Sequence, residues 1–337
     1  MKTKYYDIVL SSPFSNYDFF AHRLRELCGQ MGLTFFLVDD TWVKEFTQKV
    51  QEKEIKVRVL FDLSDNQAIE DDEYLVLARE VIRQRGTVID DPDITVATAH
   101  KGIFHNVLKE NKIPVPETII VNRSELKDFQ ITREIRSKVG VPFVVKPAWG
   151  DSGVGVILNG HYEEDLLASA EQAPNSDAFL IQKFVEPKPL GRHVGWFRMF
   201  YICGEVIPCW WDPKSHEYHL VSPQQVKRYK LVYLGRIMRS IARLSKMRKF
   251  TSEICLHTDD KFYIVDYINA DPDMNPRSFY DNGVPDELVR YIVWLLFYEG
   301  MRIVKKGQGF FDQELDDSES SAGWLEQRKL EQRAANR

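Results

Sequence analysis

A lysine followed by a glycine-rich loop forms a pattern that could bind phosphate groups. Within residues 143–156 (FVVKPAWGDSGVGV), an apolar run of strand character ends near Lys146, and a second apolar run follows the loop. The small residues of the segment are Gly150, Ser152, Gly153 and Gly155. Backbone N–H groups of glycines can approach phosphate oxygens closely because no Cβ intervenes, and a lysine adds positive charge. The segment is compatible with a phosphate-binding flap between antiparallel strands and with a plain glycine hairpin that carries a surface lysine. It is not a Walker A loop, since no G-K-[ST] opens a helix.

A second group of residues has the chemistry of a metal site. The segments 252–257 and 262–267 (FYIVDY) read as strands, and the turn 257–261 joins them. A hairpin of this kind would place Glu253 and Asp266 on adjacent strands, with Asn269 near the end of the second. Oxygen ligands of this type suit Mg²⁺, and a cation would relieve the repulsion between two neighbouring carboxylates. The alternative, a solvated acidic turn, is our interpretation of Asp259 and Asp260.

A third segment could contact a flat heterocycle. Residues 179–186 (FLIQKFVE) read as an apolar strand that ends in polar residues before Pro187. Its end could offer backbone N–H and C=O groups to an adenine edge, with Phe184 or Val185 against the ring face. Taken alone, the segment is equally a buried strand.

Alternating strands and helices precede these segments. In the first ninety residues we expect strands at 6–10, 33–38, 57–63 and 87–89, and helices at 18–31, 41–51 with a Thr41 cap, and 71–85. This rhythm predicts a small parallel sheet with helices on its faces. No G-x-G-x-x-G follows the first strand, so the pattern does not indicate dinucleotide binding.

The remainder of the chain is richer in strands. After a turn at 90–93, we expect helices at 98–110, 234–249 and 284–298. Further strands are expected at 117–121, 142–146, 178–185 and 197–209, in addition to the pair described above.

Composition excludes several classes of protein. The chain has 337 residues, a formal net charge of −5 and 44% hydrophobic residues, which is typical of a packed globular protein. This charge balance does not favour nucleic acid or a membrane surface as a partner. The four cysteines have no metal-site spacing, so we expect free thiols in a reducing compartment. No segment reads as a signal peptide or a transmembrane helix, and we expect a cytoplasmic protein.

The three segments, in this order and preceded by residues 100–121 (HKGIFHNVLKENKIPVPETIIV), resemble the ATP-grasp superfamily of carboxylate–amine ligases. The resemblance extends over residues 95–306 and implies ATP and Mg²⁺ as cofactors. It implies that Lys101 and Lys146 hold phosphates while the glycine loop closes over ATP. The positions that it assigns to adenine contacts are Gln182, Lys183 and Val185. The implied metal ligands are Glu253, Asp266 and Asn269.

The resemblance also implies the domain organisation. The fold is expected to be α/β, with a small parallel α/β domain followed by the two-subdomain ATP-grasp fold with antiparallel sheets. The boundaries are 1–95 for the first domain, 96–186 for the lid with the glycine-rich loop, and 187–310 for the subdomain with the metal site. Residues 311–337 are expected to form a weakly ordered tail, because their composition turns acidic and then basic.

The sequence departs from the family pattern at several positions. The family commonly has an acid two residues before the Asn of the last motif, where this chain has Tyr267. A D-x-R pattern is represented only by Arg198, and Glu186 is a candidate to replace its acid near the ribose. The glycine expected after the proline of the metal segment is Asp273.

The reaction implied by the resemblance is an ATP-dependent ligation. ATP phosphorylates a carboxylate to an acyl phosphate, and an amine then displaces the phosphate, with an amino acid or peptide as substrate. Arg198 is a candidate for binding the acyl-phosphate oxygens. Arg277 could share this role or form a surface salt bridge.

Two alternatives remain open. One is a kinase of the same fold that phosphorylates a hydroxyl, and the other is a nucleotide-binding protein without catalysis, which the Tyr267 substitution favours. The sequence is compatible with a homodimer, and it carries no pattern that identifies the individual substrates.

Overall fold

The computed structural model describes residues 3–13, 18–64, 72–150 and 153–306. The chain divides into two compact units. The first unit comprises residues 1–96, 199–251 and the chain from 270 onward, and the second comprises 97–198 and 252–269. The predicted tail, 311–337, and the predicted loop residue Ser152 lie outside the described residues.

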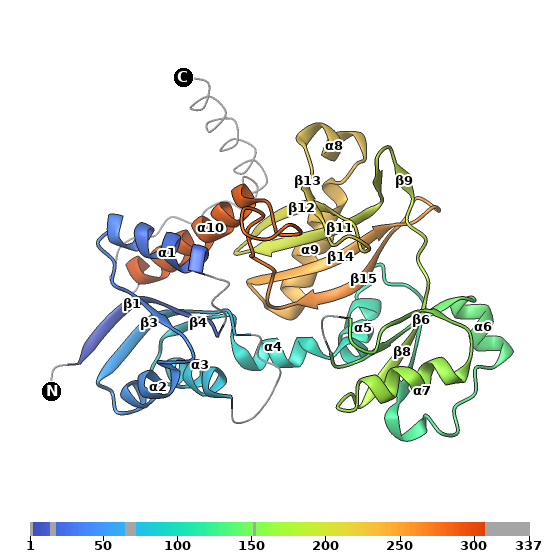
Figure 1. Ribbon diagram of the computed structural model, residues 1–337, viewed down its shortest axis with the longest axis horizontal. Helices are drawn as coiled ribbons and strands as arrows, with labels where there is room; N and C mark the ends of the chain where they lie inside the picture. Colours follow the sequence, from blue (N-terminus) through green and yellow to red (C-terminus); the bar gives the residue numbers. More distant parts are fainter. Residues whose placement is uncertain (1–2, 14–17, 65–71, 151–152, 307–337) are drawn as a thin grey trace. The chain divides into compact units, whose positions relative to one another are not determined.

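A four-stranded parallel sheet forms the centre of the N-terminal part of the first unit (Figure 1). The strand order is β2–β1–β3–β4, which confirms the predicted parallel arrangement. The strands are β1 (Lys4–Ser11), β2 (Phe35–Val38), β3 (Ile55–Asp62) and β4 (Thr87–Ile89). Nearly every side chain in the second half of β1 and β3 is buried, because helices cover both faces of the sheet.

Alternating side chains of the strands pack on different helices. Val9 and Leu60 belong to a buried cluster with residues of α2 (Val43–Gln51) and α3 (Glu73–Arg83). The neighbouring residues Ile8 and Phe61 point the other way. A Cβ added to Gly300 of α10 (Asp286–Lys306) would lie 2.9 Å from the Phe61 ring, so a glycine there permits close packing. Helix α1 (Asp18–Gln30) packs beside α10.

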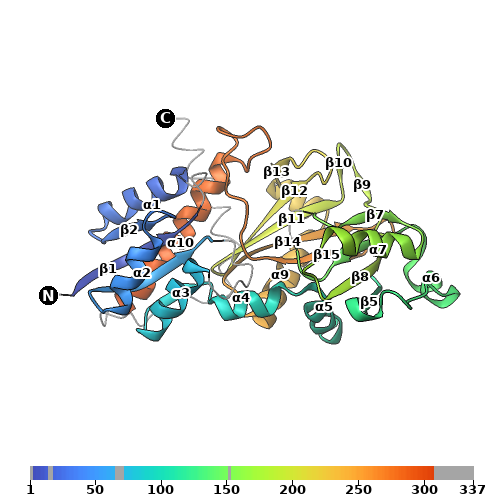
Figure 2. The same cartoon turned by 60° about the horizontal axis from the view of Figure 1, so that its bottom comes forward.

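A four-stranded antiparallel sheet dominates the second unit (Figure 2). Its order is β5–β8–β6–β7, and all printed pairings are antiparallel. The strands are β5 (Thr118–Asn122), β6 (Phe143–Pro147), β7 (Ile157–Gly160) and β8 (Ala178–Lys183). Helices α6 (Arg133–Val139) and α7 (Glu163–Gln172) pack on this sheet around the buried side chains Phe143, Val145 and Phe179. Helix α5 (Lys101–Glu110) contacts β8 and β15.

A five-stranded sheet of order β13–β12–β11–β14–β15 completes the fold, and the division between the units falls within β11 and β14. Its strands are β11 (Trp196–Ile202), β12 (Glu205–Trp211), β13 (Tyr218–Leu220), β14 (Lys249–Leu256) and β15 (Phe262–Asn269). Helix α9 (Val232–Ser245) packs against β12. The remaining short elements are α4 (Pro92–Ala99), a 3₁₀ turn at Arg123–Glu125, β9 (Pro189–Leu190), β10 (His193–Val194) and α8 (Pro223–Arg228).

The structure confirms the α/β fold with parallel and antiparallel sheets, and it corrects several boundaries. The strand predicted at 197–209 is two strands, because Cys203 and Gly204 form a turn with positive φ. The helix predicted at 234–249 ends at Ser245, where Lys246 adopts a left-handed conformation. The Thr41 cap is wrong, because Trp42 precedes α2 and makes no side-chain cap. Among the described residues, no helix is long and apolar enough to span a bilayer.

Candidate functional site

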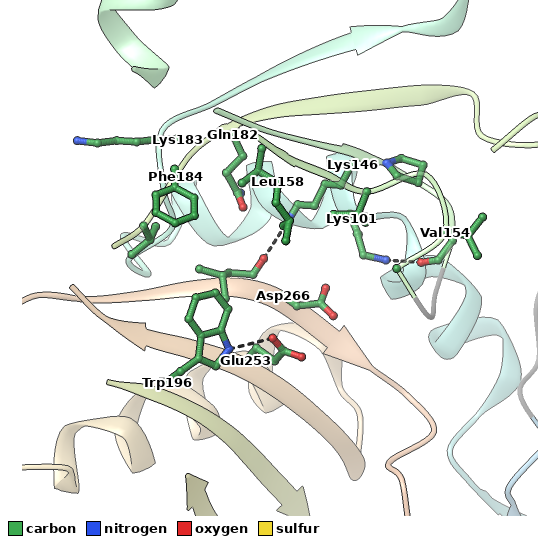
Figure 3. A pocket seen from close by; sticks show the side chains of 17 residues that line it. Lys101, Lys146, Val154, Leu158, Gln182, Lys183, Phe184, Trp196, Glu253 and Asp266 are labelled. Atoms are coloured by element: carbon green, nitrogen blue, oxygen red, sulfur yellow. Dashed lines mark hydrogen bonds between the residues drawn. The ribbon is translucent and has the colours of Figure 1, made fainter. Parts of the chain in front are cut away.

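A pocket in the second unit collects most of the residues predicted to do chemistry (Figure 3). Its cavity volume is about 260 Å³, just below the range of about 300–1,000 Å³ for small-molecule sites. Its charged and polar lining residues are Lys101, Lys146, Gln182, Lys183, Glu253 and Asp266. The apolar lining comes mainly from β6, the glycine-rich loop and the segment after β8. A flat apolar ligand part and an anionic part could therefore bind side by side.

Lys146 is the buried cation of this pocket. Strand β6 carries it opposite Leu180 of β8, and its ammonium donates a 2.6 Å hydrogen bond to the Val265 carbonyl. The ammonium also lies 5.1 Å from the centre of the Tyr267 ring. Burial is the main cause that lowers the pKa of Lys146 to about 8, and the carboxylate of Asp266 opposes this effect. An anion entering the pocket would hold Lys146 in its charged form.

A second lysine reaches the glycine loop from the start of a helix. His100 interrupts the predicted 98–110 helix and caps α5, since its Nδ1 accepts a 3.0 Å hydrogen bond from the Ile103 N–H. Its Nε2 lies 3.0 Å from Asp177. The backbone N–H of Lys101 donates to the Ala148 carbonyl, and its ammonium donates to the Gly150 carbonyl. These contacts fix Lys101 beside the loop at the start of α5.

The glycine loop requires glycine at three positions. Gly150, Gly153 and Gly155 all have positive φ, a region that side chains with a Cβ rarely adopt. Gly155 is also closely packed, because an added Cβ would lie 3.1 Å from the Ser169 carbonyl oxygen. Of these three, Gly150 and Gly153 line the pocket, so glycine backbone forms part of its wall, as in a phosphate-binding loop.

Two carboxylates face the pocket from neighbouring strands. Glu253 is on β14 and Asp266 on β15, and these strands are adjacent in the sheet, as the sequence predicts. Trp196 Nε1 donates a 3.0 Å hydrogen bond to one oxygen of Glu253, and Arg198 lies 3.2 Å from the other. Burial raises the pKa of Glu253, Arg198 lowers it, and the nearby Asp266 raises it further.

The carboxylate pair fits a divalent cation that also has phosphate ligands. The buried oxygen Asp266 Oδ1 has no hydrogen-bond partner among the described residues, which is rare for a buried acceptor. Within the same part of the chain, no group of three or more His, Cys, Asp or Glu side chains could hold a metal by itself. A cation here would therefore need oxygens from a ligand, the arrangement usual for Mg²⁺ with nucleotide phosphates.

Beneath the pocket, polar side chains from one helix and three strands form a hydrogen-bonded network. Gln182 Nε2 lies 2.9 Å from the Tyr267 hydroxyl and 3.1 Å from Thr118 Oγ1. The same hydroxyl is 2.7 Å from His105 Nδ1. Burial and the charge of Lys146 lower the pKa of His105 to about 4, so this imidazole is neutral near pH 7.

Not every predicted site residue lines the pocket. The lining residues that the structure describes include neither Gly155, Glu186 nor Asn269. Glu186 is exposed, and Asn269 ends β15. Arg198 stands behind Glu253, as its ion pair shows. Arg277 belongs to the first unit, where its guanidinium donates to the Tyr218 carbonyl.

Other residues of the site were missed. Trp196 lines the pocket and donates to Glu253, and nothing in its sequence context indicates this contact. His100 and His105 drew no attention in the sequence. The spacing of Lys101 and His105, four residues apart on one helix, could have indicated a shared face.

A family model supports the interpretation of this region. Residues 98–210 match the model for the RimK-like ATP-grasp domain. No curated protein sequence is significantly similar to the chain.

Solved structures resemble the whole fold. The ATP-grasp ligase PsnB, in a structure with minimal precursor, Mg and ADP, is 14% identical, with a TM-score of 0.58 over 89% of this chain and 98% of that one. D-alanine–D-alanine ligase from Bacillus anthracis, complexed with ATP, is 11% identical, with a TM-score of 0.59 over 91% of this chain and 100% of that one. D-cycloserine synthetase DcsG is 16% identical, with a TM-score of 0.57 over 87% and 99%. At such identities the likeness shows the fold.

Proposed function

Because the chain has the ATP-grasp fold and contains a RimK-like ATP-grasp domain, we propose that it is an ATP- and Mg²⁺-dependent ligase that joins a carboxylate to an amine through an acyl phosphate. One observation carries this proposal. Two lysines, a glycine loop and two carboxylates converge on one pocket, where Lys101, Lys146, Glu253 and Asp266 all line the wall.

ATP would lie with its base in the apolar part of the pocket and its phosphates toward the lysines. Gln182, Lys183 and Val185 would contact adenine, and Phe184, which is 40% exposed, would cover the ring. Lys146 on β6 and Lys101 beside the glycine loop would neutralise the negative charge of the phosphates. Ser152, Gly155 and Glu186 are further proposed nucleotide contacts. Gly155 and Glu186 do not line the pocket and would have to move toward the ligand.

Glu253 and Asp266 would hold Mg²⁺, with Asn269 as a proposed further ligand. Bound there, Mg²⁺ would neutralise charge on the phosphates and orient them for transfer. Trp196 and Arg198 hold the Glu253 carboxylate in place by binding its two oxygens. These two contacts therefore fix the position of the Glu253 carboxylate before Mg²⁺ or ATP binds.

The transfer itself would need positioning and charge neutralisation rather than a protein nucleophile. An oxygen of the substrate carboxylate attacks the γ-phosphorus of ATP, and ADP leaves with the electrons of the broken P–O bond. The amine then attacks the acyl carbon, and phosphate leaves. Arg198 and Arg277 are proposed to bind the oxygens of the acyl phosphate, and Arg198 would do so beside the Glu253 carboxylate with which it pairs.

The substrate class follows from the relatives only as a proposal. PsnB is described with a precursor peptide, and D-alanine–D-alanine ligase joins amino acids. We propose an amino acid or a peptide as the carboxylate or amine substrate here. The kinase alternative would transfer the same phosphoryl group to a hydroxyl, using the same lysines.

The test is ADP release from Mg-ATP with pooled amino acids, peptides and small carboxylates. Hydroxylamine serves as a general amine that converts an acyl phosphate into a hydroxamate. The proposal predicts ADP release that depends on a carboxylate, with hydroxamate formed in equal amount, and loss of both in Asp266→Ala. A stable phosphoester without hydroxamate would instead establish the kinase, and binding of ATP without any turnover would favour the non-catalytic alternative.

A further inference from the structure

The amide of Gln182 is held in one orientation by its neighbours. Gln182 is the penultimate residue of β8 and pairs directly opposite Thr118 of β5. Its side chain is almost completely buried, as are those of Tyr267 and His105. Gln182 Nε2 makes two hydrogen bonds, at 3.1 Å to Thr118 Oγ1 and at 2.9 Å to the Tyr267 hydroxyl.

The hydroxyl proton of Thr118 indicates which end of the Gln182 amide faces these partners. Thr118 has one hydroxyl proton, and it is donated to the Pro116 carbonyl at 2.9 Å. Thr118 Oγ1 can therefore only accept from Gln182. If the amide were flipped, its oxygen would meet Thr118 Oγ1 with no proton between them. The structure accordingly has Nε2 toward Thr118 Oγ1 and the Tyr267 hydroxyl.

The Tyr267 hydroxyl continues this series of hydrogen bonds from Gln182 to His105. It accepts from Gln182 and lies 2.7 Å from His105 Nδ1, and it donates its own proton to that nitrogen in the neutral tautomer of His105 that carries its proton on Nε2. His105 is neutral and able to accept because its burial in the network disfavours the imidazolium form. In this tautomer the donor order is Gln182 to Tyr267 to His105.

Both amide hydrogens of Gln182 are consumed, and its oxygen remains for a ligand. No described residue donates a hydrogen bond to Gln182 Oε1. Gln182 lines the pocket immediately before the hinge residues Lys183, Phe184 and Val185. In Figure 3 its oxygen points into the pocket. The site therefore presents a fixed acceptor next to the place proposed for the base.

We propose that Tyr267, Thr118 and His105 act as positioning residues that lock Gln182 as an acceptor and thereby select adenine over guanine. Adenine carries an exocyclic amino group at C6, which can donate to Gln182 Oε1. Guanine carries a carbonyl oxygen there, which would face another acceptor and leave a buried oxygen unpaired. A freely rotating glutamine could turn its NH₂ toward guanine and would not discriminate. This inference rests on the proposed nucleotide site.

The inference also gives Tyr267 a role of its own. Tyr267 stands where related motifs carry an acid, but its hydroxyl points to Gln182 and His105, and its ring lies under the Lys146 ammonium. The residue thus connects the phosphate-facing lysine with the base-facing glutamine. Removing only the hydroxyl should alter base selection and leave the ring beneath Lys146 unchanged.

The experiment compares dissociation constants of Mg-ATP and Mg-GTP by isothermal titration calorimetry. In the wild type, ATP is expected to bind about 10- to 100-fold more tightly than GTP, the factor for one hydrogen bond lost and one acceptor left unpaired. In the double variant Tyr267→Phe with Thr118→Val, the amide can flip. The preference should fall by about tenfold, mainly because GTP binds more tightly.

Two further variants keep the outcome interpretable. Gln182→Met removes the acceptor and should also lower the preference, so it tests the inference if the double variant is unstable. Tyr263→Phe, a matched change on the same strand whose hydroxyl contacts the exposed Asp259, should leave the preference unchanged.

The results separate this inference from the proposed function. An unchanged preference in a folded double variant, or in Gln182→Met, would overturn the selection role while ATP binding stands. Equal wild-type affinity for ATP and GTP would overturn it as well. Failure of the wild type to bind either nucleotide would instead overturn the proposed function, and this inference with it.

Discussion

The buried ammonium of Lys146 should make the protein less stable without its ligand than it would be with an apolar side chain there. Lys146 is 7% exposed, and burial lowers its pKa from the usual 10.5 to about 8. Lys146→Met keeps a long unbranched side chain and removes the charge. We expect this variant to unfold at higher temperature than the wild type at pH 7, while it loses nucleotide binding.

The size of the effect follows from the pKa. At about 1.4 kcal/mol per pKa unit, the displacement of the Lys146 pKa corresponds to about 3 kcal/mol against the charged form in the folded state. The variant also loses the hydrogen bond to the Val265 carbonyl, which costs about 1 kcal/mol. The net gain in the free energy of unfolding at pH 7 should be about 2 kcal/mol.

The difference in the free energy of unfolding between Lys146→Met and the wild type should decrease as the pH rises. The folded-state pKa of Lys146 lies below its unfolded value, so between pH 8 and 10.5 the unfolded chain binds a proton that the folded chain does not. The free energy of unfolding of the wild type therefore rises with pH in this window, by about 1.4 kcal/mol per pH unit from this group. Below pH 8 the unfavourable contribution is fully present.

Urea unfolding of the ligand-free wild type and Lys146→Met, at pH values from 7 to 10, measures this difference. Other titrating groups are common to both chains and cancel in the comparison. The excess in free energy of unfolding of Lys146→Met over the wild type should be largest at pH 7 and should disappear as the pH approaches 10. A variant that is less stable than the wild type at pH 7, or an advantage independent of pH, would refute the reasoning.

Further predictions concern the first unit. Asp72→Ala removes the side-chain acceptor for two N–H groups in the first turn of α3 and should lower the free energy of unfolding by about 1 kcal/mol, measured by urea unfolding. Gly86→Ala would place a Cβ 2.5 Å from the Val57 carbonyl oxygen and should cost more than about 2 kcal/mol, measured in the same way. The matched change Gly29→Ala, in α1 with no atom within 4 Å of the added Cβ, should instead stabilise by up to about 1 kcal/mol. Equal effects of the two glycine variants would contradict the packing described here.

The sequence predicted those parts of the fold and the site whose signals are local. The parallel sheet followed from short apolar runs separated by amphipathic helices, and β4 was placed at its observed bounds. The Lys146 loop was visible because a strand, a lysine and glycines are contiguous. The adjacency of Glu253 and Asp266 followed from one hairpin with a short turn.

The errors arose where tertiary contacts override local preference. Lys249 was placed at the end of a basic helix, but it begins β14 and is buried, and its ammonium donates to the Ala270 carbonyl. The helix break at His100 depends on its contacts with Ile103 and Asp177, the latter far away in the sequence. Neither contact leaves a periodic pattern in the chain.

The network around Tyr267 could not be predicted for the same reason. It joins residues 105, 118, 182 and 267 from a helix and three strands, and only their packing brings the polar atoms together. The sequence showed Tyr267 only as a departure from a motif. The structure shows the partners of its hydroxyl, which no spacing rule contains.

The most direct test of the account is whether Mg²⁺ strengthens nucleotide binding through Asp266. Isothermal titration calorimetry with ATP would compare the wild type and Asp266→Asn, each with Mg²⁺ and with EDTA. We expect Mg²⁺ to tighten ATP binding to the wild type by about tenfold or more, and Asp266→Asn to lose most of this gain while still binding ATP weakly. A wild type that does not bind ATP, or an equal gain from Mg²⁺ in the variant, would contradict it.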